Sequence, residues 1–297
     1  MIKCYVSKYN SLCFGASSAV EAAYEHLSDS LFLYGDVINN PVITADLCSK
    51  GAKIVNDITK MKDTRNSKLL IRAHGVPKKT IDYLEDNNVN YIDKTCPKVK
   101  KIHKIVKDAS SKGLDIIIVG DPNHPEVVGI KGWAKTNVIT IKDMISAKEK
   151  VPYSNVSSTG VCMVVQTTYN KMAYDEIQKY CLTLLPFVEC HDTICNDTAN
   201  RQIEVRNLAQ QVDCIIVIGG KKSSNSIKLF EIASEYCNKT QHVQIESEID
   251  LTIIENVSSL ALVGGASTPI ESIIKSIEIL RSACYNSGIE FELIRQT

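Results

Sequence analysis

The chain has 297 residues, and its 44% hydrophobic content is enough to build the buried cores of one to three domains. Lysine plus arginine (34) equals aspartate plus glutamate (34), so the formal net charge is zero. This balance argues against nucleic acid or an anionic membrane surface as the main partner, because both favour an excess of basic residues.

The N-terminal sequence and the lack of a long apolar run indicate a cytoplasmic protein. No apolar run approaches the roughly 20 residues that cross a bilayer. The first residues, MIKCY, lack the apolar stretch and the cleavage site of a signal peptide. Eleven cysteines are unusual in this setting, because in a reducing compartment cysteines serve more often as core residues, metal ligands or catalysts than as disulfides.

In chain order, one pattern recurs three times: a short apolar strand, a cysteine, an amphipathic helix, and a second strand that ends in glycine. The first copy consists of Ile2–Val6, Cys13, a helix over 17–27, Leu31–Tyr34 and Gly35. The second copy consists of 89–92, Cys96, a helix over 98–110, a strand over 114–119 and Gly120. The third copy consists of 186–188, Cys195, a helix over 200–209, Cys214–Ile218 and Gly219.

Each copy continues with a polar turn, a second helix and a third strand that ends in small or polar residues. The turns are Asn39-Asn40-Pro41, Asn123-His124-Pro125 and Ser223-Ser224-Asn225, and the strand ends are Ala73-His74-Gly75, Gln166-Thr167-Thr168 and Gly265-Ala266-Ser267. Alternating strands and helices indicate parallel sheets with right-handed crossovers, which bind ligands at the carboxyl ends of their strands. We therefore predict three pseudo-symmetric α/β domains with mostly parallel sheets around one central site.

Three of the eleven cysteines differ from the rest in their position. Seven are interpreted as core or helix residues: Cys4, Cys48, Cys162, Cys181, Cys214, Cys237 and Cys284. Cys13, Cys96 and Cys195 instead lie at strand-to-helix turns, where free amides and the helix dipole stabilise a thiolate. Three thiolates suit a [4Fe–4S] cluster with one open iron, and a zinc ion with three cysteines and a water is the alternative. Cys190 is the candidate for a fourth ligand.

Two of the polar turns carry groups that suit chemistry or anion binding. His124 and Glu126 place an imidazole and a carboxyl on one loop, although a helix cap and a first-turn acid are the alternative interpretation. Residues 223–225 precede a helix, where amides and hydroxyls can bind an anion, but serine and asparagine are also ordinary N-caps.

Taken together, the motifs resemble the LytB/IspH family of 4-hydroxy-3-methylbut-2-enyl diphosphate reductases along essentially the whole chain. The matching stretches are Leu12-Cys13-Phe14-Gly15, Arg72-Ala73-His74-Gly75-Val76, Asp93-Lys94-Thr95-Cys96-Pro97, residues 120–126, Gln166-Thr167-Thr168, Thr193-Ile194-Cys195, Arg201-Gln202, residues 219–226 and residues 264–269. The resemblance implies three α/β domains in a trefoil around one oxygen-sensitive [4Fe–4S] cluster per chain, held by Cys13, Cys96 and Cys195.

The resemblance also assigns roles to the polar residues. It makes Glu126 the proton-delivering acid with Thr167 and His124 as its catalytic partners. The residues that it assigns to the substrate diphosphate are His74, His124, Ser223, Ser224, Asn225 and Ser267. The implied reaction is reductive removal of an allylic hydroxyl, giving isopentenyl and dimethylallyl diphosphates, with ferredoxin or flavodoxin as the electron donor.

The resemblance also sets the expected domain organisation. We expect domains at 14–95, 96–194 and 195–297, with the N-terminal strand, residues 1–13, joining the third domain. The expected oligomeric state is a monomer or a weak dimer.

The sequence departs from the family pattern at a few positions. Asn39 stands where the family has a further substrate-binding histidine, and an amide cannot carry the positive charge that strengthens binding of a diphosphate. Lys94 and Asp197 stand where the family has small residues. A reductase with weaker binding and a paralogue with another substrate are both consistent with these changes. A cluster-based redox sensor and a zinc hydrolase are rivals from other classes.

Overall fold

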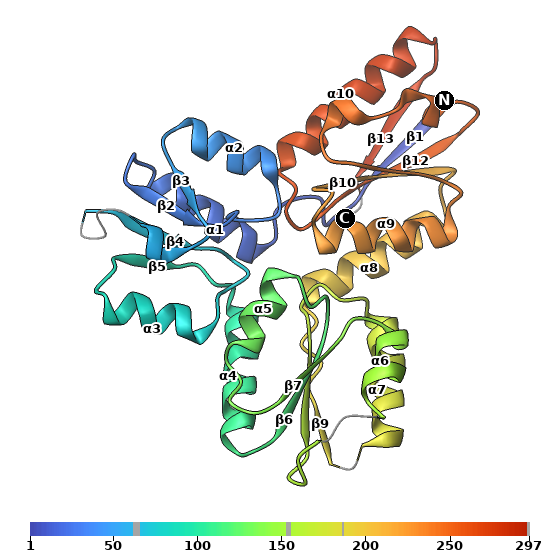
Figure 1. Ribbon diagram of the computed structural model, residues 1–297. Coiled ribbons are helices and arrows are strands. Elements are labelled where there is room, and N and C mark those ends of the chain that lie inside the picture. The colour runs from blue at the N-terminus through green and yellow to red at the C-terminus, as the bar shows by residue number, and fades with distance from the viewer. Residues whose placement is uncertain (62–65, 153–155, 186, 296–297) are drawn as a thin grey trace. The chain divides into compact units, whose positions relative to one another are not determined.

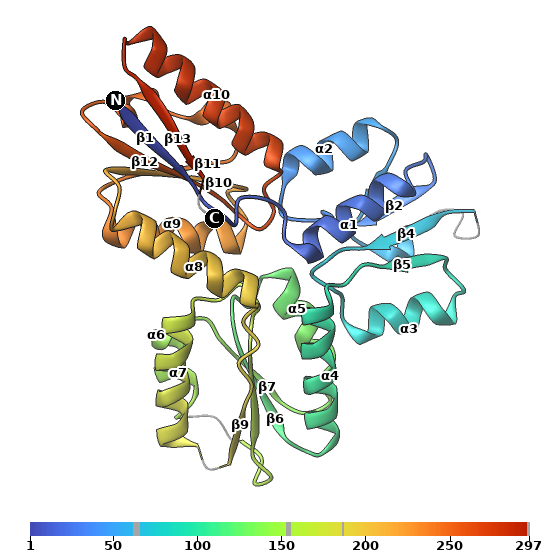
Figure 2. The same ribbon diagram turned by 180° about the vertical axis from the view of Figure 1, so that it is seen from behind.

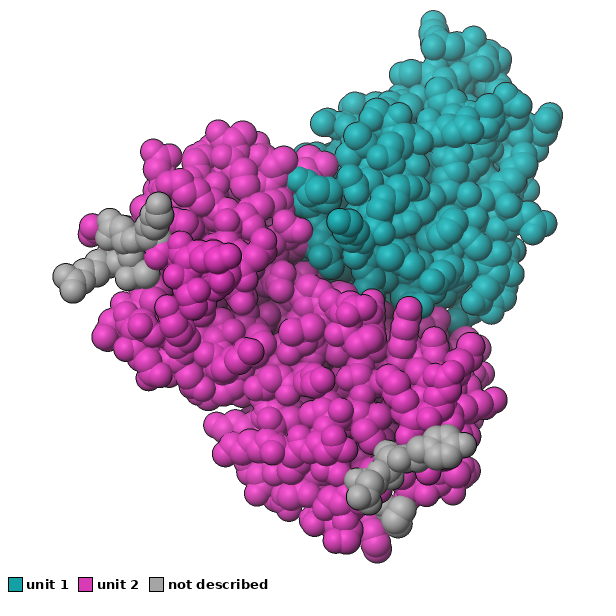
Figure 3. All heavy atoms as spheres, viewed as in Figure 1, with its two compact units in different colours: residues 1–17, 39–41, 196–297 teal, residues 18–38, 42–195 magenta. Residues whose placement is uncertain are grey.

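The computed structural model describes residues 1–61, 66–152, 156–185 and 187–295, whose helices and strands are drawn in Figure 1 and, from behind, in Figure 2. The chain forms two compact units, coloured in Figure 3. Unit 1 comprises Met1–Ser17, Asn39–Pro41 and Asn196–Thr297, and unit 2 comprises Ser18–Ile38 and Val42–Cys195. Unit 1 contains one parallel sheet and unit 2 contains two, so the predicted fold of three parallel α/β sheets is confirmed.

The sheet of unit 1 has the strand order β11-β10-β12-β1-β13. Its strands are β1 (Ile2–Val6), β10 (Cys214–Ile218), β11 (Lys239–Val243), β12 (Ser259–Gly264) and β13 (Phe291–Arg295). One face packs against α8 (Asn196–Ala209) and α9 (Ser224–Tyr236), and the other packs against α10 (Ile270–Asn286). Successive residues of β10 and β12 alternate between the two cores, which explains why these strands are apolar throughout.

The first sheet of unit 2 has the order β3-β2-β4-β5. Its strands are β2 (Leu31–Tyr34), β3 (Lys53–Val55), β4 (Lys68–Ile71) and β5 (Tyr91–Asp93). Helix α3 (Lys78–Asp86) packs against one face through Leu84, which joins a core with Leu69 and Ile71. Figure 1 shows α1 (Phe14–Glu25) and α2 (Pro41–Ser49) on the other side of this sheet.

The second sheet of unit 2 repeats the same order, β7-β6-β8-β9. Its strands are β6 (Asp115–Val119), β7 (Val138–Ile141), β8 (Val161–Val165) and β9 (Val188–Cys190). Helices α4 (Pro97–Ser111) and α5 (Pro125–Lys131) cover one face, and α6 (Met144–Lys150) and α7 (Lys171–Leu184) cover the other. Residues 116–119 have no exposed surface, as expected for a strand that is buried on both faces.

The threefold repeat read from the sequence is present in the strand order of the three sheets. The strand before each repeat cysteine, β1, β5 or β9, lies beside the third strand of its sheet, β12, β4 or β8. Because β1 pairs with both β12 and β13, the N-terminal strand completes the sheet of unit 1. The domain boundaries at 14–95, 96–194 and 195–297 stay a prediction.

Several expected bounds differ from those in the structure. The helix expected from residue 17 begins at Phe14, the one expected from residue 98 begins at Pro97, and the one expected from residue 200 begins at Asn196. The strand expected over 89–92 is Tyr91–Asp93, and the one expected over 186–188 is Val188–Cys190, where Pro186 lies outside the described residues. None of the helices in the described part of the chain combines the length and apolar composition of a membrane span.

A substitution in the central strand β6 tests the importance of the doubly buried strands. We expect Ile117→Ala to lower the free energy of unfolding by about 2–5 kcal/mol, because a fully buried isoleucine leaves a cavity when it is truncated. Urea unfolding followed by circular dichroism measures the change. The control is Ile145→Ala, at a side chain that is 70% exposed, and equal losses in the two variants would contradict the assignment of β6 to the core.

Candidate functional site

The three repeat cysteines are held by the same backbone hydrogen bond. Each of their amides donates, at 3.0 Å, to a carbonyl two residues beyond the end of the third strand of its sheet. The pairs are Cys13 with Ala266, Cys96 with Ala73, and Cys195 with Thr167. Each cysteine also immediately precedes a helix, α1, α4 or α8. The sequence prediction that these cysteines lie at strand-to-helix turns is therefore confirmed.

Cys96 and Cys195 belong to unit 2 and lie close enough to interact electrostatically. Burial raises the pKa of the Cys96 thiol, and the nearby Cys195 and Glu126 act in the same direction. The amides of Lys98 and Val99 oppose this shift by donating to the sulfur. A bound cation would relieve the repulsion between two thiolates, so this pair fits a thiolate-ligated metal group.

The third repeat cysteine, Cys13, belongs to unit 1, and each unit is described by itself. Within the described ranges, no three histidine, cysteine, aspartate or glutamate side chains are grouped so that they could hold a metal ion. The set of Cys13, Cys96 and Cys195 therefore stays a prediction. The donor chemistry that is described, two thiols with amide donors at a helix N-terminus, suits the predicted group.

Glu126 is a buried carboxyl that is bound at both oxygens by one residue. It lies in the first turn of α5, is 2% exposed, and accepts hydrogen bonds from the amide and the hydroxyl of Thr167, both at 2.6 Å. Burial raises the pKa of Glu126, whereas the two bonds from Thr167 oppose the rise. Since Thr167 also accepts from the Cys195 amide, the residue that holds the carboxyl contacts a predicted cluster ligand directly.

His124 is a buried, neutral imidazole with a defined tautomer. Its Nδ1 accepts from the amide of Glu126 at 3.2 Å, so the ring proton is on Nε2. Burial lowers the pKa of His124 to about 4, and the charge of Arg72 acts in the same direction. The His74 ring meets the His124 ring edge to face, with centroids 5.3 Å apart, and its pKa is also lowered by burial, by His124 and by Arg72. Unit 2 thus brings His74 against His124, and His124 against Glu126.

The polar turn before α9 presents a buried amide that has no hydrogen-bond partner in the part of the chain that the structure describes. Ser223 caps the helix by accepting from the amide of Ser226, as the helix-cap interpretation expected. Asn225 is 3% exposed, yet neither its amide nitrogen nor its amide oxygen has a hydrogen-bond partner among the described residues. Because an unpaired buried amide costs free energy, this side chain indicates a ligand site at the start of α9.

Asn39 and Ser267 both lie beside this turn in unit 1. A Cβ atom on Gly220 would lie 2.4 Å from the Asn39 carbonyl oxygen, so only glycine allows the two loops to approach this closely. The Asn40 side chain donates to the Ser267 carbonyl at 2.8 Å, so the loop that contains Ser267 is bound to the loop that contains Asn39 and Asn40. Unit 1 therefore gathers all five predicted substrate residues that it contains: Asn39, Ser223, Ser224, Asn225 and Ser267.

The cysteines of the central strands fit the core interpretation. Cys4, Cys162 and Cys214 are fully buried, and burial raises the pKa of each thiol to about 12. Such thiols are poor ligands, because metals bind the thiolate. Cys190, the candidate fourth ligand, lies in β9 and packs against the hydrophobic core of its sheet, which is a structural position.

Comparison with known proteins identifies the family. Residues 4–281 match the family described as LytB protein. This chain belongs to the LytB family. Among its LytB relatives, a protein from Caldanaerobacter subterraneus is 35% identical, covering 93% of this chain and 96% of its own, and one from Clostridioides difficile is 36% identical, covering 93% and 99%. Both are named 4-hydroxy-3-methylbut-2-enyl diphosphate reductase.

Two solved reductase structures are similar to this LytB chain in fold. The E-1-hydroxy-2-methyl-but-2-enyl-4-diphosphate reductase from Plasmodium falciparum matches with a TM-score of 0.89, covering 99% of this chain and 92% of its own at 24% identity. A structure of (E)-4-hydroxy-3-methyl-but-2-enyl diphosphate reductase matches with a TM-score of 0.66, covering 96% and 100% at 28% identity. The match to the Plasmodium falciparum structure shows a similarity of the fold alone.

The structure adds two residues to the candidate site, Arg72 and Asn40, to which no role was given from the sequence. Arg72 influences both histidines through its charge, and Asn40 ties its loop to Ser267. The sequence could have pointed to Arg72, because it lies two residues before His74 in a motif that matches the family. Asn40 lies in the repeat's polar turn, but nothing in the sequence indicated its partner Ser267, which is 227 residues away.

Thr167→Val tests the contact between Thr167 and Glu126. The variant removes one hydrogen bond to the carboxylate but keeps the backbone one, so we expect the free energy of unfolding at pH 7 to fall by about 1–3 kcal/mol. That bond lowers the pKa of Glu126, so without it the folded-state pKa rises further. The loss is therefore larger at high pH, where Glu126 is charged in the folded protein, than at low pH, where it is protonated.

Urea unfolding of the cluster-free protein at both pH values measures this difference. Thr183→Val is the control, because its exposed hydroxyl also donates to an oxygen, the Tyr180 carbonyl, and its loss should change stability by less than about 0.5 kcal/mol. A pH-independent loss in Thr167→Val would contradict a charge-dependent bond.

Proposed function

We propose that this chain is a 4-hydroxy-3-methylbut-2-enyl diphosphate reductase of the non-mevalonate pathway. The allylic hydroxyl leaves as water while two electrons and two protons are taken up, which yields isopentenyl and dimethylallyl diphosphates. The observation that carries the proposal is the buried Glu126 carboxyl, bound by Thr167 and lying within electrostatic range of Cys96. The curated relatives with this name, which are matched over nearly their whole length, support the same activity.

Cys13, Cys96 and Cys195 would hold one [4Fe–4S] cluster per chain. When bound, the cluster supplies electrons, received from a ferredoxin or flavodoxin, and a Lewis-acidic iron. The protein supplies orientation, protons and a low-dielectric environment.

Glu126 serves as the proton donor in this proposal. Burial favours its protonated form, and a general acid works best when its pKa lies near the operating pH. The Thr167 hydroxyl fixes the direction of the carboxyl, and the Thr167 amide holds its other oxygen. His124 stays neutral because its pKa is about 4, and its Nε2–H can donate to an oxygen of the substrate.

The diphosphate is bound by the polar groups at the loop ends. Asn225 offers an amide whose hydrogen bonds are not used within the described protein, and the free amides at the start of α9 add a positive dipole end. Ser223, Ser224 and Ser267 supply hydroxyls, and the imidazoles of His74 and His124 supply neutral donors. Asn39 donates through its amide alone.

The decisive test combines a metal count with a turnover assay. Protein purified without oxygen should contain about four iron and four sulfide per chain. Glu126→Gln should keep that content, while turnover with a reduced viologen dye falls by a factor of about 10² to 10⁴ through loss of the general acid. About one zinc per chain would identify a hydrolase, and iron without turnover would identify a redox sensor. Undiminished turnover in Glu126→Gln would remove Glu126 from its role.

Asn39→His tests the departure from the family pattern. A histidine that becomes cationic beside the diphosphate makes charge-assisted hydrogen bonds, so we expect kcat/KM to rise by a factor of about 3 to 10. Steady-state kinetics on the same substrate measures the gain, with Asn39→Gln as the uncharged control. No gain or a loss would favour a paralogue with another substrate.

A further inference from the structure

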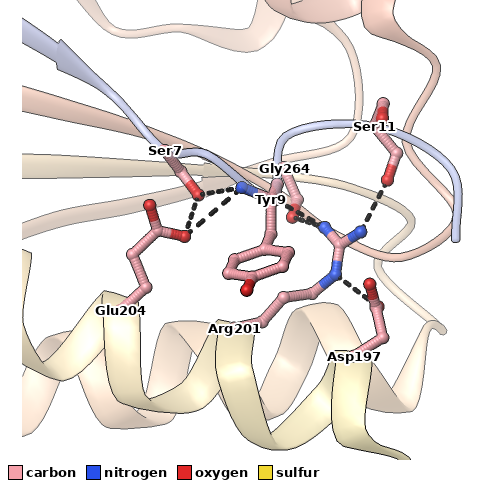
Figure 4. A network of polar contacts seen from close by, with 7 residues as sticks. All are labelled: Ser7, Tyr9, Ser11, Asp197, Arg201, Glu204 and Gly264. Carbon is pink, nitrogen blue, oxygen red and sulfur yellow. Dashed lines mark hydrogen bonds and ion pairs between the residues drawn. The ribbon is translucent and has the colours of Figure 1, made fainter. Parts of the chain in front are cut away.

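Helix α8 holds the loop of residues 7–12, which leads from β1 to Cys13. Figure 4 shows Arg201 extending from this helix toward the loop. Its Nη1 donates to the Tyr9 carbonyl at 2.5 Å and to the Gly264 carbonyl at 2.8 Å, and its Nη2 donates to the Ser11 carbonyl at 2.8 Å. One guanidinium thus joins two points of the loop to the end of β12.

Glu204, one helical turn further along α8, binds the beginning of the same loop. Its carboxylate accepts from the Ser7 hydroxyl at 2.6 Å, from the Lys8 amide at 2.6 Å and from the Tyr9 amide at 3.4 Å. Arg201 therefore donates hydrogen bonds to carbonyl groups of the loop, while Glu204 accepts hydrogen bonds from its amides and from the Ser7 hydroxyl. Together the two residues bind both kinds of backbone group, which an irregular segment cannot satisfy by itself.

The loop needs such support because regular pairing holds it only at its ends. The Ser7 amide donates to the Leu262 carbonyl at 2.9 Å, and the Cys13 amide donates to the Ala266 carbonyl at 3.0 Å. Between these points, the Asn10 backbone lies so close to Gly264 that a Cβ atom there would be 2.7 Å from the Asn10 oxygen. The position of Cys13 thus depends on how the intervening loop is held.

Arg201 is only 2% exposed, and its buried charge is matched by a partner. Its Nε donates to the Asp197 carboxylate at 2.7 Å, one turn earlier on α8. Asp197 is one of the residues that depart from the family pattern, and this ion pair gives it a defined role. A guanidinium with a matched charge and three carbonyl partners has a fixed geometry, because its planar fork sets the directions of its bonds.

We propose that Arg201 and Glu204 are positioning residues that fix the backbone at Cys13 and thereby set the placement of its thiolate for iron. The proposal rests on the proposed function, since Cys13 is a cluster ligand there. It assigns a role to the Arg201-Gln202 motif, whose arginine lies 188 positions along the chain from the cysteine that it supports.

The first arm of the test uses the cluster-free protein. Arg201→Lys keeps the charge but cannot reach three carbonyls, and Glu204→Gln keeps the shape but loses the charge that strengthens three bonds. In both, hydrogen exchange of the amides of residues 7–13 should accelerate by at least about tenfold. Arg281→Lys on α10 and Glu231→Gln on α9 are the matched controls, because their contacts are with Phe291 and Lys228, respectively.

The second arm uses the protein loaded with iron and sulfide. Both variants should lose iron to a chelator about tenfold faster than wild type, and the electron paramagnetic resonance spectrum of the reduced cluster should shift as the ligand geometry changes. Arg201→Lys, which retains part of the contact, should show a smaller spectral shift than Arg201→Met. A purely structural role would leave the spectrum of the remaining cluster unchanged.

The outcomes separate this proposal from the proposed function. Unchanged exchange in residues 7–13 overturns the holding role of α8. Faster exchange with wild-type iron retention and spectrum overturns the positioning role, while the iron site itself stands. Wild-type protein that takes up no iron overturns the proposed function and, with it, the role for the Cys13 thiolate, even where the exchange arm shows a held loop.

Discussion

One backbone hydrogen bond, repeated three times, determines where the three repeat cysteines lie. The amide of each repeat cysteine donates to a carbonyl two residues beyond the third strand of its sheet. Because the strands are parallel, that place is the carboxyl edge of the sheet, where helix N-termini also begin. Cys13, Cys96 and Cys195 therefore have equivalent backbone positions, and amides at a helix start can stabilise a thiolate.

Two polar groups of the candidate site are buried at a cost that a purely structural protein would avoid. Glu126 is a carboxyl in the interior whose pKa is raised by burial, and the Asn225 amide is buried without a partner in the described chain. Buried polar groups that lack hydrogen-bond partners are typical of functional sites, where function outweighs the cost in stability. In the proposed enzyme, the substrate supplies the missing partners: the diphosphate for Asn225 and the leaving hydroxyl for the acid.

The structure explains some of the departures from the family pattern better than others. Asp197 balances the buried charge of Arg201, so its presence has a physical reason within this chain. Lys94 reaches the Ser18 hydroxyl at 3.4 Å, which is a weak contact. Asn39 keeps its backbone in close contact with Gly220, and only its side chain differs in chemistry from the family histidine. The fold therefore accommodates these changes without loss of the site's framework.

Patterns along the chain were enough to predict the three repeated units, the parallel sheets and the position of each repeat cysteine before a helix. These features follow from local patterns: apolar runs, helical spacing and the turn residues between them. The edge strands β3, β7, β11 and β13 were not predicted, and most of their residues are partly or fully exposed, unlike the fully buried strands β6 and β10.

Only the tertiary structure decided how groups far apart in the sequence are paired. The bonds from Arg201 to the loop before Cys13, from Asn40 to Ser267, and from Thr167 to Glu126 join residues that are 41 to 227 positions apart. No periodicity connects such positions, because hydrogen bonds between loops depend on the geometry that the packed sheets impose.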